Sequence, residues 1–250
     1  MDEYARRMIK KISDVYDLSP IERSTVERDI PKLFHVDAFL LSKEEKLQTM
    51  RKIVQDLKRR PTTEDRADER VSITGQMLGS FVPKSILDVG AGTGEILTGL
   101  QNHYRVSNAY AIDFKLPTKD QSFQTLLYTD QMTIPLPNES VDLIIIFETL
   151  HHIHPKDRLV TLKEVARILK PGGRCLISEH DDNQSTAFYN FMELYHLFWY
   201  AANNEKVDPL YLMARVDTMK LFKDVGLTSM NYQPRSGPNP QRIYHEVYTK

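Results

Sequence analysis

Two stretches of the chain have residue types and spacings that could do chemistry. The first is ILDVGAGTGE at 86–95, where three glycines alternate with other residues shortly after Asp88. Glycine tolerates positive φ and lets a backbone approach a ligand closely, and a helix N-terminus offers free N–H groups. The second is ETLHHIH at 148–154, whose carboxylate and imidazoles are groups that can take or give a proton.

The elements around these stretches predict where the side chains gather. We expect strands at 86–89, 108–114, 124–128, 141–147 and 174–179, with helical patterns between them. Strands that alternate with helices indicate an α/β fold with a parallel sheet. The run 141–147 is apolar throughout, as a central strand buried on both faces should be. Ligands bind outside the carboxyl ends of such strands, which is where Asp113 and Glu148 stand.

Residues 1 to about 82 contain no convincing strand. Ser19 with Glu22, and Ser42 with Glu45, fit capping boxes at helix starts. Pro31 is expected to stop the first of these helices. Basic clusters lie at 6–7, 10–11 and 58–60. A solvated helix surface is the favoured interpretation of these clusters, and a patch that contacts phosphates is the alternative.

The composition is that of a soluble globular protein. The formal net charge of −1 gives no global attraction to nucleic acid, although a local basic groove stays open. The single cysteine, Cys175, forbids an intrachain disulfide and is expected to be a buried core residue. We see no bilayer-spanning run and no signal-peptide pattern, so a cytoplasmic location is expected.

The glycine stretch resembles motif I of the class I S-adenosylmethionine (SAM)-dependent methyltransferases. The pattern G-x-G-x-G follows Asp88, whereas a dinucleotide fingerprint reads G-x-G-x-x-G. FETLHHI at 147–153 and LKPGG at 169–173 are similar to segments of the same family, of the methyltransferase type 11 kind. The resemblance covers roughly 86–179, with a weaker tail in which 219–226 looks like the last helix, and 227–232 with 242–248 like a closing hairpin.

The resemblance implies a Rossmann-like α/β fold. Its sheet should have seven mostly parallel strands, an antiparallel last strand and helices on both faces, with an N-terminal helical extension at 1–82 and the methyltransferase domain at 83–250. It implies SAM as cofactor and S-adenosylhomocysteine as product. Asp113 would accept from the ribose hydroxyls, as an acceptor-only carboxylate can, and Asp130 from the adenine amine. The implied cofactor residues are Asp88, Gly90, Ala91, Gly92, Gly94, Asp113, Phe114, Asp130, Gln131 and Phe147.

The methyl acceptor should bind beside the insertion at 180–213. The aromatic run at 188–200 predicts either a helix packed between layers or a pocket wall. The substrate candidates are His152, Tyr189, Tyr195 and Trp199. The run ISEHD and the pair Tyr195-His196 also resemble methyltransferases of large viruses, which implies guanine N7 of an RNA cap as acceptor. A small-molecule acceptor is the alternative; a non-catalytic SAM-binding module and a nicotinamide enzyme are alternatives of other classes.

The acceptor decides whether a base is needed. A nitrogen with a free lone pair needs none, whereas a hydroxyl or an acidic carbon does. The catalytic candidates are Glu148, His151 and His180, with His152 as a further base candidate. The spacing of His151, His152 and His154 fits no metal-ligand motif, so no metal is predicted.

Overall fold

The computed structural model divides the chain into two compact units. One unit, here the helical unit, consists of Met1–Thr62 and Asp182–Leu210; the other, the sheet unit, consists of Thr63–Asp181 and Tyr211–Lys250. The structure describes residues 2–16, 18–35, 38, 40–57, 64–113, 122–128, 133–182, 184–204, 206–235 and 241–250. No helix in these ranges has the length and apolar character that a membrane span requires.

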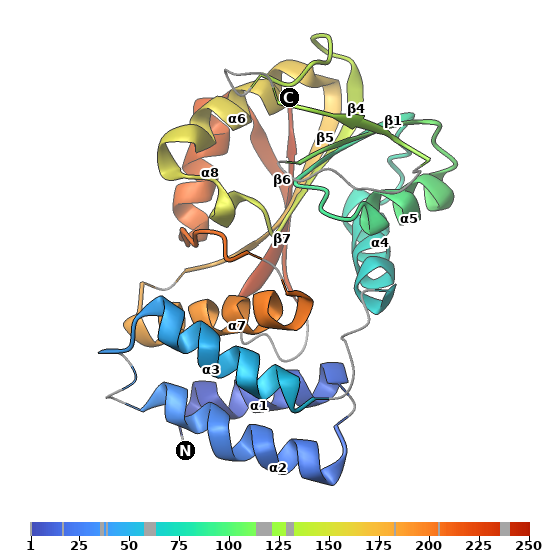
Figure 1. Cartoon of the computed structure of the whole chain (residues 1–250). Helices are drawn as coiled ribbons and strands as arrows, with labels where there is room; N and C mark the ends of the chain where they lie inside the picture. Colours follow the sequence, from blue (N-terminus) through green and yellow to red (C-terminus); the bar gives the residue numbers. More distant parts are fainter. Residues whose placement is uncertain are drawn as a thin grey trace. The chain divides into compact units, whose positions relative to one another are not determined.

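The sheet unit is built on seven strands in the order β3-β2-β1-β4-β5-β7-β6 (Figure 1). Strands β1 to β5 pair in parallel, and β7 pairs antiparallel with both β5 and β6. This confirms the predicted Rossmann-like sheet. The strands are β1 Ser85–Val89, β2 Asn108–Ile112, β3 Gln124–Leu126, β4 Val141–Phe147, β5 Leu169–His180, β6 Thr228–Pro234 and β7 Ile243–Thr249.

Helices cover both faces of this sheet, as predicted. On one face the core joins Met77 of α4 (Glu64–Leu78) and Leu97 of α5 (Glu95–Tyr104) to Ile145 of β4. On the other face it joins α6 (Pro155–Ile168) and α8 (Arg215–Asp224) to alternate residues of the same strands. Cys175 is fully buried in the second core, which confirms the expectation for the lone cysteine.

Two predicted boundaries are wrong. Strand β5 begins at Leu169, so the LKPGG run lies within the strand and is not a turn before it. A Cβ at Gly173 would stand 2.9 Å from the Lys170 carbonyl oxygen, so the glycine lets the strand bulge against β4. Helix α8 begins at Arg215, where 219 was predicted, because the Arg215 N–H finds a partner in Asp181 Oδ1 at 2.9 Å.

The helical unit packs α7 (Thr186–Asn203) against α1 (Glu3–Tyr16) and α3 (Lys43–Gln55). Both predicted capping boxes are confirmed, one at α3 and one at α2 (Pro20–Asp29). Helix α2 ends at Asp29, just before Pro31, as predicted, and a 3-10 helix (Ile30–Phe34) follows with this proline in its first turn, where a missing N–H is tolerated. Lys46 and Glu193 form an ion pair of 2.7 Å between α3 and α7.

The aromatic run is thus part of the unit that contains the N-terminal helices. Helix α4, by contrast, groups with the sheet and packs against α5, β5 and β7. These unit limits differ from the predicted division at residue 82. The limits of the two units follow from which apolar faces pack together in the fold. No change of composition along the chain marks them.

Candidate functional site

The glycine loop (residues 90–94) joins β1 to α5. Gly90, Gly92 and Gly94 have φ values of 81°, 54° and 79°, the left-handed region that favours glycine. A Cβ on Gly90 would stand 2.2 Å from Thr149 Oγ1, and one on Gly94 would stand 2.2 Å from the Phe123 ring. A Cβ on Gly92 would meet nothing within 4 Å. The loop therefore packs tightly at its two ends and leaves its middle open to a ligand.

Two aspartates support the loop in different ways. Asp113 follows β2, and its Oδ2 accepts the Gly92 N–H at 2.8 Å. Asp88 lies on β1 and is only 3% exposed, so it lies within the core below the loop. Burial, together with the charge of Asp113, raises the pKa of Asp88 to about 8. Asp113 is thus the carboxylate next to the open part of the loop.

The other cofactor candidates are placed only in part. Ala91 is half-buried in the loop, and Phe147 ends β4 with 7% of its surface exposed. Phe114, Asp130 and Gln131 lie outside the described residues.

A buried carboxylate and imidazole form a pair where β4 and β5 end. Glu179 Oε2 lies 2.7 Å from His151 Nδ1, and Glu179 Oε1 accepts the Leu150 N–H at 2.8 Å. The side chains are 5% and 2% exposed. An ionised carboxylate only accepts, so His151 Nδ1 carries the hydrogen and Nε2 is the basic nitrogen. Burial raises the pKa of Glu179 and lowers that of His151.

Other imidazoles surround this pair. The ring centres of His152 and His180 lie 4.3 and 4.9 Å from that of His151. His180 donates from Nδ1 to the Gln241 carbonyl oxygen at 2.9 Å, and burial lowers its pKa. His154 instead caps α6, because its Nδ1 accepts the Lys156 N–H at 3.3 Å. The structure therefore gathers three of the predicted histidines and gives the fourth a local structural role.

Glu148 is held by a cation. It follows β4 with a φ of 51°, and its carboxylate forms an ion pair with Arg70 of α4. The Arg70 guanidinium also lies 5.8 Å from the centre of the Phe147 ring. This ion pair fixes the Glu148 carboxylate against Arg70. Sequence reasoning missed Arg70, which stands in no motif, and gave no role to Glu179 of the ISEHD run, because each meets its partner only through the fold.

The predicted aromatic substrate residues all lie on α7, in the helical unit. Tyr189 is 43% exposed, whereas Tyr195 is 7% exposed. The Tyr195 ring centre lies 6.3 Å from Phe191 and 6.1 Å from Trp199. Tyr195 is therefore a core residue of its unit, in line with the packing alternative, and Tyr189 is a surface residue.

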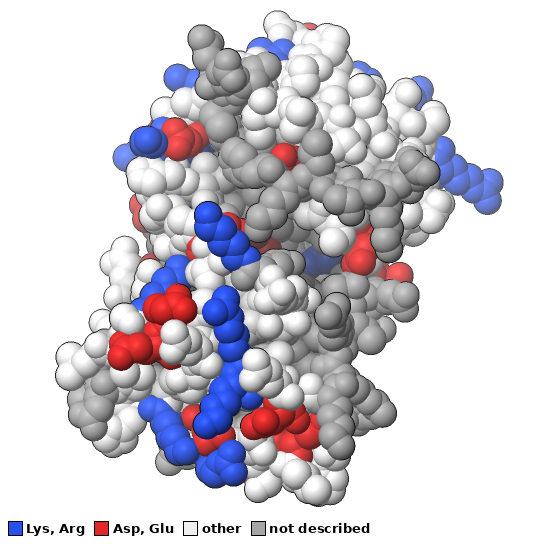
Figure 2. Space-filling model, viewed as in Figure 1, with Lys and Arg blue, Asp and Glu red and all other residues white. Residues whose placement is uncertain are grey.

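The surface charges intermingle. Lys and Arg side chains lie among Asp and Glu side chains on the face shown in Figure 2. Arg7 forms an ion pair with Glu3, and Lys32 with Asp29 at 2.7 Å. The predicted basic cluster at 58–60 lies outside the described residues. This mixture is typical of solvated helix surfaces and gives a phosphate-binding track no support.

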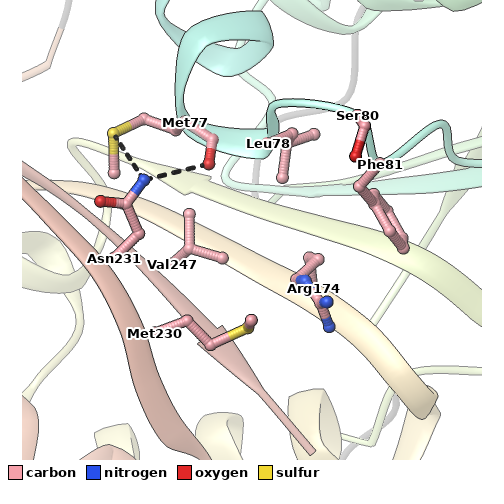
Figure 3. A pocket seen from close by; sticks show the side chains of 8 residues that line it. All are labelled: Met77, Leu78, Ser80, Phe81, Arg174, Met230, Asn231 and Val247. Carbon is pink, nitrogen blue, oxygen red and sulfur yellow. Dashed lines mark hydrogen bonds between the residues drawn. The ribbon is translucent and has the colours of Figure 1, made fainter.

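A cavity of about 500 Å³ lies beside α4 at the other end of the sheet (Figure 3). Arg174, which lines the cavity, is paired in the sheet with Leu143, near the start of β4. The glycine loop instead follows the end of β1, so it lies at the opposite end of these parallel strands. The cavity is therefore distinct from the candidate site. Its lining residues are Met77, Leu78, Ser80, Phe81, Arg174, Met230, Asn231 and Val247.

Solved structures share the fold of this chain. The 1,6-didemethyltoxoflavin-N1-methyltransferase of Burkholderia thailandensis, solved with 1,6-didemethyltoxoflavin and S-adenosylhomocysteine, superposes with a TM-score of 0.55. The two chains are 17% identical, and the match covers 75% of this chain and 79% of that one. At this identity the likeness shows the fold alone, which is the Rossmann-like methyltransferase fold.

Part of the sequence is similar to known methyltransferases. Residues 87–177 match the model of a methyltransferase domain. A malonyl-[acyl-carrier protein] O-methyltransferase of Coxiella burnetii is 33% identical over 96 residues, which cover 38% of this chain and 33% of that protein. The demethylmenaquinone methyltransferase of Bacillus licheniformis is 26% identical over 182 residues, covering 62% and 76%. Residues 87–177 are thus similar to a methyltransferase domain, and the chain spans only about a third of the Coxiella relative.

Proposed function

We propose that the chain is a SAM-dependent methyltransferase whose acceptor gives up a proton. The residues present fit this cofactor: the middle of the glycine loop is open at Gly92, and Asp113 offers a carboxylate to ribose hydroxyls. Asp130 and Gln131 are the proposed adenine contacts. When bound, SAM supplies a methyl group that its sulfonium has already activated.

The observation that carries the acceptor class is the 2.7 Å contact between His151 and Glu179. A buried carboxylate that holds one nitrogen of an imidazole orients the other nitrogen as a general base. His151 Nε2 would take the proton from an acceptor hydroxyl or acidic carbon, and Glu179 would stabilise the imidazolium that forms. The proposed function is therefore methylation of a small molecule at a hydroxyl or acidic carbon.

Guanine N7 of an RNA cap is the alternative acceptor. Its lone pair needs no base, so the His151–Glu179 pair does not favour it, and the relatives reported above lend it no support. A non-catalytic SAM-binding module is the alternative of another class. The His151–Glu179 pair argues against that alternative, because a module without turnover has no use for an oriented base.

Calorimetry followed by a methyl-transfer screen tests the proposal. SAM is expected to bind and NAD(H) is not; labelled SAM is then offered to phenols, alcohols, β-dicarbonyl compounds, and capped and uncapped RNA. Label on hydroxyl or carbon acceptors, lost in His151→Ala but not in His103→Gln, supports the proposal. Label on the cap guanine alone would replace it with the viral-type activity, and SAM binding without transfer to anything would favour the non-catalytic module.

A further inference from the structure

Polar side chains from separate strands line up on the α4 side of the sheet. Ser178 of β5 pairs with Phe147 of β4 and with His245 of β7, so the three stand in one row across the sheet. Residues in such a row point to the same face. Arg70 lies over the Phe147 ring and so marks this face as the one beneath α4. We refer to Ser178 and His245 as the polar row.

The polar row is buried and its hydrogen-bonding capacity is unused. Ser178 is 0% exposed and His245 is 2% exposed. Within the described part of the chain, Ser178 Oγ and both ring nitrogens of His245 have no hydrogen-bond partner. Buried polar groups almost always have partners, and leaving one without a partner costs about 1–3 kcal/mol. Three such atoms in adjacent residues are what a site for a polar ligand group presents.

The charges around the row balance. Arg70 is paired with Glu148, and Arg235 with Glu69 at 2.6 Å. Burial and these two cations lower the pKa of His245 to about 4, so its imidazole is neutral near pH 7. Because each guanidinium group is already paired with a carboxylate, a charged group buried in the row would find no net counter-charge. A neutral imidazole and a hydroxyl together donate and accept, so they suit an uncharged group that does both.

We propose that Ser178 and His245, with Arg70 above them, bind an uncharged donor–acceptor group of the methyl acceptor, of the carboxamide kind. The assignment of this group to the acceptor rests on the proposed function. His180 lies two residues after Ser178 on β5 and so shares its face, and its ring centre lies 4.9 Å from that of His151. A group held in the row therefore belongs to a molecule that also reaches His151. Because the row is buried, admitting the group requires a side chain above it to move, and Arg70 lies over the Phe147 ring of the same row.

Histidine ring signals in NMR spectra test this subsite directly. The protein is labelled with ¹⁵N in its 8 histidine rings, and His245→Gln assigns the His245 signals by their loss. Benzamide, benzoate and benzylamine are added in turn, with and without S-adenosylhomocysteine. Benzamide is expected to shift the His245 signals, with benzoate and benzylamine at least ~10-fold weaker, because a charged group would have to be buried there.

Serine variants test whether the benzamide response arises at the polar row. Ser178→Ala is expected to weaken benzamide binding about 10-fold, the effect of one lost hydrogen bond of about 1.4 kcal/mol. Ser72→Ala, an exposed serine on α4, is the matched control and is expected to leave the response unchanged. Ser178→Cys keeps a side chain of similar size but replaces the hydroxyl with a weaker hydrogen-bond donor. This variant tests whether benzamide binding depends on that hydroxyl, should Ser178→Ala fail to fold.

The proposal is overturned if His245 ignores benzamide, if the charged probes bind as well, or if both Ser178 variants respond like the unchanged protein. The spectra need no methyl transfer. A benzamide response in a protein that methylates nothing would therefore remove the proposed function and leave the subsite standing. Methyl transfer without any response of His245 to benzamide would remove the subsite and leave the proposed function standing.

Discussion

The two sides of the candidate site are built in opposite ways. On the proposed cofactor side, the loop at 90–94 and Asp113 lie in one short stretch of the chain, and the Asp113 carboxylate accepts a backbone N–H of the loop. On the acceptor side, the polar groups come from residues as far apart in the chain as Arg70 and His245. Backbone geometry leaves a local signature, because only glycine tolerates the required φ and space. A site whose side chains come from different strands leaves no such local signature in the sequence.

The largest expected effect separates the two sides. His151→Ala should lower the rate of methyl transfer about 10²–10⁴-fold, the usual contribution of a general base, and leave the affinity for S-adenosylhomocysteine unchanged. Single-turnover assays and calorimetry measure the two quantities. Glu179→Gln should cost less than His151→Ala, since the base remains. An equal loss of affinity in His151→Ala would show that the two sides are not independent.

The same residue sets the acid side of the pH profile. Burial holds the pKa of His151 well below the ordinary 6.5, and the base acts only when neutral. Activity should therefore stay level as the pH falls to 6.5 and decline only below it. A decline in activity that begins above pH 6.5 would show that another titrating group controls the acid side of the pH profile.

The next effect compares two glycines within the loop. Alanine at either position costs about 1–2 kcal/mol of stability for the left-handed backbone. Gly90→Ala adds roughly 1–3 kcal/mol of overpacking, because its Cβ would stand 2.2 Å from Thr149 Oγ1. Gly92→Ala meets no neighbour and should mainly reduce the affinity for S-adenosylhomocysteine. Urea unfolding and calorimetry separate these outcomes; equal stability of the two variants would contradict the packing role of Gly90.

A smaller effect is expected at Asp113. Asp113→Ala should weaken S-adenosylhomocysteine binding about 10–100-fold, since a hydrogen bond to a charged group contributes about 1.5–3 kcal/mol. Asp113→Asn keeps an acceptor and should lose less. Asp224→Ala, an exposed aspartate at the end of α8, is the control and should bind as the unchanged protein does. Intact binding by Asp113→Ala would count heavily against the proposed cofactor site.

A separate effect, on stability and dependent on pH, belongs to Asp88. Its pKa is raised to about 8 in the folded protein, so the folded state keeps a proton that the unfolded state loses at lower pH. The unchanged protein should therefore lose about 1.4 kcal/mol of stability per pH unit from roughly pH 5 to 8, and level off above 8. Asp88→Asn does not titrate and should lack this slope. Urea unfolding at pH 6 and 9 measures it, and parallel behaviour of both proteins would mean that Asp88 is ionised in the fold.

The sequence predicted most of the sheet, because strand patterns, glycine turns and capping boxes are local. The predictions failed where a distant partner decides. The start of α8 depends on Asp181, and the start of β5 depends on a bulge against β4. The aromatic helix illustrates the same limit, since its composition fits a pocket wall and a core equally well. Only its packing in the helical unit makes Tyr195 a core residue.

The sequence by itself determined the Rossmann-like fold and the glycine loop, and it indicated Asp113 and the histidine pair as candidates. The tertiary structure alone decided that Glu179 orients His151, that Arg70 holds Glu148 and that Ser178 stands beside His245. The physical reason is the range of the forces involved. A φ angle or a helix cap is settled within a few residues, whereas an ion pair or a buried hydrogen bond requires the whole sheet to bring its partners together.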